Sequence, residues 1–102
     1  MYVLHIEHPV RDFDGWKKAF DDDPLARERA GVRRYQVSRP ADDPYFAIVD
    51  LEFEHREQAE AMLASLRELW RGAGTAFVQD PKARIAEIIE SRVLARPSSR
   101  AA

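Results

Sequence analysis

Two kinds of apolar pattern alternate along the chain. In residues 2–8 apolar and polar positions alternate, which predicts a strand with one apolar face. That face carries Tyr2, Leu4 and Ile6, and the opposite face carries Val3, His5 and Glu7. Residues 32–39 and 45–53 predict two further strands, and the second of these is apolar on both faces from Tyr45 to Val49. Residues 84–93 predict a fourth strand, anchored by Ile85, Ile88 and Ile89.

Helical spacing occurs between these strands. Phe13, Trp16 and Phe20 form the apolar stripe of a first helix, with Asp12 as its N-cap. The longest helix is predicted for residues 56–70. Its buried stripe is Ala59, Met62, Leu63, Leu66 and either Leu69 or Trp70. Asp23 and Pro24 predict the start of an additional short helical piece, which Gly31 ends.

The order of these elements, β-α-β-β-α-β, predicts an α+β domain of the ferredoxin-like class. Both helices are then expected on one face of a four-stranded antiparallel sheet, with the first and third strands in the middle. We expect a single domain over residues 1–94. Residues 95–102 are expected to form a flexible tail, because their composition supports no packed element.

The sheet face without helices is predicted to be apolar. If Leu4, Ile6 and Val49 face the helices, then Val3, Phe46, Ile48 and one set of the fourth-strand isoleucines face outward. Such a patch is larger than monomers usually expose. A second copy could cover it by two-fold symmetry, so we expect a homodimer in which two sheets close into a barrel.

Composition narrows the range of functions. The net charge of −2 gives no indication of nucleic acid as a partner. Without cysteine, disulfides, thiolate metal sites and a cysteine nucleophile are excluded. The sequence contains no dinucleotide or phosphate-loop motif, so no cofactor is expected. It also shows no signal-peptide pattern and no membrane-spanning run, so a cytoplasmic location and no membrane partner are expected.

The element order, the length and the nearly continuous apolar third strand resemble the dimeric α+β barrel proteins. This group includes antibiotic-biosynthesis-monooxygenase-like and small cyclase-like proteins, and the resemblance covers roughly residues 2–93. Segments typical of an uncharacterised bacterial branch are residues 16–24, 31–35, 49–53 and 66–70. The resemblance implies a pocket between the helices and the sheet or inside the barrel. It does not imply a particular reaction, because the fold hosts many.

Candidate catalytic groups gather on the open sheet face. His5 and Glu7 lie on the first strand, and Asp50 and Glu52 on the third. A histidine oriented by an aspartate is a general base, so His5 with Asp50 could take a proton from a carbon acid or a phenol. A structural role is the alternative, since polar groups at a dimer interface often form ion pairs that fix its register.

Further residues are candidates for contact with a substrate. On the open face these are Glu7, Arg34, Phe46, Ile48 and Glu52, with Arg34 included if Tyr35 and Val37 face the helices. Trp70 lies beside the stretch of residues 71–82, which is a candidate lid. No metal site is expected, because His5 and His8 point to opposite faces of a strand.

Two functions fit this sequence. The first is a cofactor-independent oxygenase, cyclase or isomerase acting on a small aromatic or polyketide-like substrate. The second is a non-catalytic protein that binds a hydrophobic small molecule in the same cavity. The sequence leaves open whether the protein is an enzyme.

Overall fold

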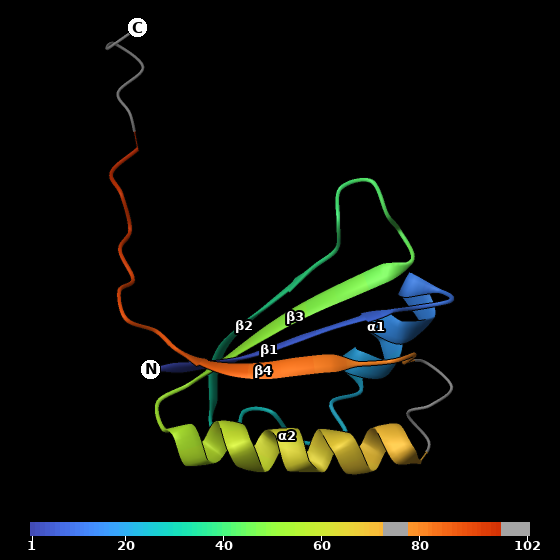
Figure 1. Cartoon of the computed structure of the whole chain (residues 1–102), viewed down its shortest axis with the longest axis horizontal. Coiled ribbons are helices and arrows are strands. Elements are labelled where there is room, and N and C mark those ends of the chain that lie inside the picture. Colours follow the sequence, from blue (N-terminus) through green and yellow to red (C-terminus); the bar gives the residue numbers. More distant parts are fainter. Residues whose placement is uncertain (73–77, 97–102) are drawn as a thin grey trace, which may run out of the picture.

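The computed structural model describes residues 1–72 and 78–96. The elements are β1 (Tyr2–Pro9), α1 (Phe13–Asp21), β2 (Val32–Ser38), β3 (Phe46–Phe53), α2 (Arg56–Arg71) and β4 (Lys82–Glu87). This order confirms the predicted β-α-β-β-α-β arrangement. Figure 1 shows α2 running along the sheet, with α1 at the right-hand end of the strands.

The four strands form one sheet in the order β2-β3-β1-β4. Every neighbouring pair is antiparallel, so β1 and β3 are the central strands, as predicted. Each helix therefore connects two strands that follow each other in the sequence but are not neighbours in the sheet, which is the ferredoxin-like topology.

Alternation along the two central strands sets the core. On β1 the buried positions include Leu4 and Ile6, and on β3 they are Ala47, Val49, Leu51 and Phe53. The helices close this face with Trp16 from α1 and with Ala59 and Met62 from α2. The core therefore lies between one sheet face and the helices, and the intervening strand positions form an open face.

A bulge in β2 changes which side chains of this edge strand lie on each face of the sheet. Val32 pairs with Phe53, but Arg34 pairs with Glu52, so Arg33 is an extra residue. Because of this extra residue, Val32 packs against the core while Arg34 lies on the open face. The expected placement of Arg34 is confirmed.

The predicted fourth strand has the wrong limits. β4 begins at Lys82, two residues before the predicted start, and ends at Glu87, before Ile88 and Ile89. The pairing between β4 and β1 ends at the same point. Tyr2 pairs with Glu87, and the last backbone bond runs from the Ile88 amide to the Met1 carbonyl at 2.9 Å. Ile89 is 85% exposed and is not a strand anchor.

The prediction of a short helical piece that begins at Pro24 is also wrong, because residues 22–31 form turns. Asp23 and Ala26 have positive φ values of 53° and 49°, which a right-handed helix does not allow. Gly31 has a φ of 104°, as expected for the residue that leads into β2.

The open face is more polar than predicted. The residues that β4 contributes to it are Lys82, Arg84 and Ala86, and none of them is an isoleucine. At one end Val3 pairs with Ala86, and the larger apolar group lies at the other end, where Pro9 pairs with Phe46 and Ile48 follows. We call Pro9, Phe46 and Ile48 the apolar end of the open face.

Beyond β4 the chain leads away from the sheet (Figure 1). Residues 88–96 form no regular element, and residues 97–102 of the expected tail lie outside the described residues. Within residues 1–72 and 78–96, no helix has the length and apolar character needed to cross a membrane.

Candidate functional site

His5 and Asp50 meet on the open face because they occupy paired positions on the two central strands. The distance between His5 Nδ1 and Asp50 Oδ1 is 2.7 Å. On the other side of the ring, His5 Nε2 lies 3.0 Å from Glu7 Oε1. These three residues form what we call the His5 cluster, and their side chains are 31–42% exposed in the single chain.

The two carboxylates favour the protonated form of His5. Burial by itself lowers the pKa of His5, but the hydrogen bonds and charges of Asp50 and Glu7 outweigh it and raise that pKa above its usual value. In the imidazolium form both ring nitrogens donate, Nδ1–H to Asp50 and Nε2–H to Glu7. For His5 to accept a proton from a substrate at Nε2, Glu7 must first turn away.

The rest of the open face carries one further ion pair and more cationic residues. Arg34 Nε lies 2.9 Å from Glu52 Oε2. On the β4 side, Lys82 pairs in register with Glu7, and Arg84 with His5. Cationic residues thus lie on the edge strands and acidic residues on the central strands, which is the pattern of an ion-pair network.

We expect the stabilising effect of His5 to depend on pH. Its pKa is raised in the folded protein, so its contribution is complete below pH 6.5, the usual pKa, and is lost as the pH rises through the folded pKa. The free energy of unfolding lost in His5→Gln should therefore be larger at pH 5.5 than at pH 8.5. Urea denaturation at one protein concentration measures this difference.

Asp50→Asn is the matched control for this pH series, because it removes the main hydrogen-bond partner of His5 while keeping the imidazole. The pH dependence of stability should weaken in this variant as well. An equal loss at both pH values in His5→Gln would show that the carboxylates do not hold a proton on His5.

His8 differs from His5 in its environment. Its side chain is on the core face and the residue is only 2% exposed, with the ring edge against Trp16 at a centroid distance of 5.6 Å. Burial lowers the pKa of His8, although a hydrogen bond from Nδ1–H to the Pro9 carbonyl at 3.1 Å partly opposes this. His5 and His8 thus lie on opposite faces, as predicted. Within residues 1–72 and 78–96, no group of three or more potential ligands is arranged to hold a metal ion.

A second candidate site lies on the other side of the sheet. A cavity of about 310 Å³ separates the sheet from the helices, and we call it the helix-side cavity. Its sheet floor consists of Ile6, Val49 and Leu51. The walls are Trp16, Ala19 and Phe20 from α1, and Met62, Leu66, Leu69 and Trp70 from α2. The turns after α1 add Asp22, Asp23, Pro24, Leu25 and Arg27, and Val78 completes the lining.

The predicted site residues therefore divide between two faces. His5, Glu7, Arg34, Phe46, Ile48, Asp50 and Glu52 share the open face. Trp70 is on the opposite side and lines the helix-side cavity. None of these open-face residues lines the helix-side cavity, and only Arg34 borders the open groove outside it. That His5 faces a ligand cavity therefore stays a prediction, and part of the candidate lid, residues 73–77, lies outside the described residues.

The sequence interpretation did not select Arg27 or the turns around it. Arg27 lines both the helix-side cavity and the groove outside it. It lies seven residues after Phe20 in an irregular segment, so no periodic pattern connects it with the aromatic stripe. The apolar lining residues were predicted as core, and a hydrophobic pattern cannot distinguish a filled core from a hollow one.

No protein-family model and no curated protein sequence matches this chain. Solved structures do match it, at low sequence identity. SnoaB, a cofactor-independent oxygenase from Streptomyces nogalater, has a TM-score of 0.71 at 12% identity, covering 88% of this chain and 94% of SnoaB. A provisionally named antibiotic biosynthesis monooxygenase from Nitrosomonas europaea has a TM-score of 0.69 at 22% identity, covering 88% of this chain and 100% of its own.

A dimeric ferredoxin-like protein from an uncultured marine organism has a TM-score of 0.67 at 9% identity, covering 92% of this chain and 100% of its own. The chain thus has the ferredoxin-like fold found in dimeric α+β barrel proteins and in antibiotic-biosynthesis-monooxygenase-like proteins. At these identities the similarity establishes the fold and leaves the reaction open.

Proposed function

We propose that this protein binds a small aromatic or polyketide-like molecule in the helix-side cavity and acts on it without a cofactor, as an oxygenase, cyclase or isomerase. The observation that carries the proposal is the cavity itself. Its volume of about 310 Å³ is at the lower end of the range for small-molecule sites, and its lining is mostly apolar and aromatic. Trp16, Phe20 and Trp70 offer ring faces to a flat ligand.

The shared fold supports the catalytic part of this proposal, because SnoaB is a cofactor-independent oxygenase. In such chemistry the deprotonated substrate supplies the electrons that reduce O2. The protein then has to bind the substrate, exclude water and accept a proton. An apolar, largely aromatic cavity suits the first of these requirements.

One observation favours the second candidate, a non-catalytic binding protein. Among the described residues that line the cavity there is no histidine, lysine or tyrosine, and the charged groups are Asp22, Asp23 and Arg27. His5, the predicted base, lies across the sheet from the cavity. A catalytic role for His5 and Asp50 would require a second ligand site on the open face.

We also propose a homodimer formed through the open face. A second copy would cover the apolar end and surround the His5 cluster, which would bring His5 into an enclosed space. The solved structures of similar fold named dimeric ferredoxin-like proteins support the existence of a dimer. Burial of matched ion pairs would also fix how the two copies align.

The cavity can be tested by blocking it. Ala19→Phe places a ring at the wall of the cavity, so binding of the neutral aromatic probe 2-naphthamide should weaken at least about tenfold, since a filled site leaves no room for the ligand. Isothermal titration calorimetry measures the affinity. Ala64→Phe is the matched control, because Ala64 is exposed on α2 and does not line the cavity.

Equal binding to both variants would show that the probe binds elsewhere and would remove the cavity from the proposal. To separate the two candidate functions, a panel of small phenols and 1,3-diketones is incubated with the protein in air. Oxygen uptake or a new product mass supports the enzyme, whereas recovery of every bound compound unchanged supports the binding protein.

A further inference from the structure

Arg27 places a mostly buried guanidinium at the wall of the helix-side cavity. Its side chain is only 14% exposed, and no other cationic residue of the described chain lines this cavity. A charge in such a position is costly unless something pairs with it. The partners of its nitrogen atoms therefore indicate what the site can bind.

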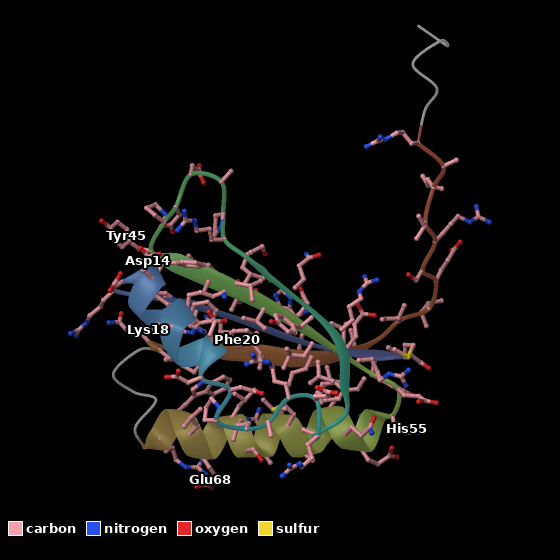
Figure 2. The ribbon with its side chains drawn as sticks, turned by 180° about the vertical axis from the view of Figure 1, so that it is seen from behind. Asp14, Lys18, Phe20, Tyr45, His55 and Glu68 are labelled. Atoms are coloured by element: carbon pink, nitrogen blue, oxygen red, sulfur yellow. The ribbon has the colours of Figure 1, made fainter. Side chains whose placement is uncertain are left out.

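Two aromatic rings lie against this guanidinium. The Arg27 Cζ lies 3.8 Å from the centroid of the Phe20 ring and 5.0 Å from that of Tyr35. Figure 2 shows Phe20 at the end of α1, where the chain turns into the connection to β2. Stacking uses the faces of a guanidinium and leaves its N–H groups, which lie in its plane, free to donate.

Protein acceptors use only part of this donor set. Nη1 donates to the Phe20 carbonyl oxygen at 2.8 Å and lies 3.4 Å from Asp23 Oδ1. Nε and Nη2 form no hydrogen bond or ion pair with the residues described by the structure. Asp23 is itself engaged, because its Oδ1 accepts the backbone N–H of Arg27 at 2.9 Å.

We propose that Arg27 binds the carboxylate of an aromatic monoanion whose ring system occupies the helix-side cavity. This inference rests on the proposed function and names its substrate class. A carboxylate matches the planar Nε and Nη2 donors in a bidentate arrangement, and the apolar surroundings strengthen such a pair. Asp22 and Asp23 at the same wall disfavour further negative charge, so the proposed ligand carries a single carboxylate.

Two probes of equal size test this proposal, 2-naphthoate and 2-naphthamide, which differ in charge. Wild-type protein should bind the carboxylate about tenfold more tightly than the amide, as measured by titration calorimetry. Both tryptophans of the chain, Trp16 and Trp70, line the cavity, so a change in their fluorescence confirms where each probe binds.

Arg27→Met should abolish this preference while leaving amide binding within about twofold, because methionine keeps an unbranched apolar side chain against the two rings. Arg27→Lys should retain an intermediate preference, since it keeps the charge and loses the planar donors. Arg33→Met is the matched control: Arg33 is exposed, pairs with Glu54 and does not line the cavity. It should keep the full preference.

Equal affinity of the wild type for both probes, or tighter binding of the amide, would overturn the proposal, as would an unchanged preference in Arg27→Met. These outcomes differ from failure of the proposed function. If neither probe binds and neither changes tryptophan fluorescence, the cavity is not a binding site for two-ring aromatic molecules.

Discussion

Ile48→Asp is expected to convert the protein from a dimer to a monomer. Ile48 lies on the central strand β3, at the apolar end of the open face, and pairs with Glu7 on β1 and Ser38 on β2. In a dimer formed through this face, the new carboxylate would be buried without a partner and placed beside Glu7. Two-fold symmetry applies this cost twice, at several kcal/mol for each buried charge. The dimer dissociation constant should therefore rise by at least about a thousandfold.

Light scattering after size exclusion at micromolar concentration measures the mass directly. The wild type should show twice the chain mass of 11.8 kDa, and Ile48→Asp a single chain mass. Phe46→Asp should act in the same way, because Phe46 belongs to the same apolar end. Ala64→Asp, on the exposed side of α2, is the control and should remain a dimer.

A dimeric Ile48→Asp variant would place the interface elsewhere on the molecule, and a monomeric wild type would remove the dimer altogether. The result also bears on His5. Without a second copy the His5 cluster is about one-third exposed, and a solvent-exposed imidazolium between two carboxylates is an ion pair with no enclosed substrate. The catalytic hypothesis for His5 therefore depends on the dimer.

Strand parity was enough to predict that His5 and Asp50 share the open face of the sheet. Leu4 and Ile6 mark one face of β1, and Val49 and Leu51 mark one face of β3. Because side chains alternate, the polar residues between them must share the other face. The antiparallel register of the central strands then brings His5 and Asp50 directly opposite each other.

The errors have a different origin, because they depend on where partners end or where the backbone turns. Ile88 and Ile89 continue an apolar pattern, but the pairing of β4 with β1 ends at Glu87 and Tyr2. Asp23 and Pro24 resemble a helix start, yet the left-handed conformation of Asp23 and Ala26 directs the chain into turns. These turns also place Arg27 at the cavity. The same irregular segment therefore explains both the wrong helix prediction and why Arg27 was not predicted as a site residue.

The cavity also limits what the aromatic stripe of α1 contributes to stability. Trp16 is 6% exposed, and its ring lies 5.4 Å from the ring centroid of Phe13 and 5.5 Å from that of Phe20. It also borders the helix-side cavity, so part of its surface already lacks close neighbours. The side chain is therefore both a core residue and a wall of the proposed site.

Trp16→Ala is expected to lower the free energy of unfolding by about 3 kcal/mol, near the low end of the range for removing a buried tryptophan, because the new void merges with an existing one. For a domain of this size, the melting temperature should fall by more than about 10 °C.

Trp70→Ala is the matched comparison: it removes the same side chain from the same cavity, but at the less buried end of α2. It should cost clearly less stability and yet weaken 2-naphthamide binding as strongly. Urea denaturation and calorimetry on both variants measure these effects. Removing a tryptophan from a packed core costs more than about 1 kcal/mol of unfolding free energy. A smaller loss in Trp16→Ala would therefore show that the α1 stripe lines the cavity without contributing to the core.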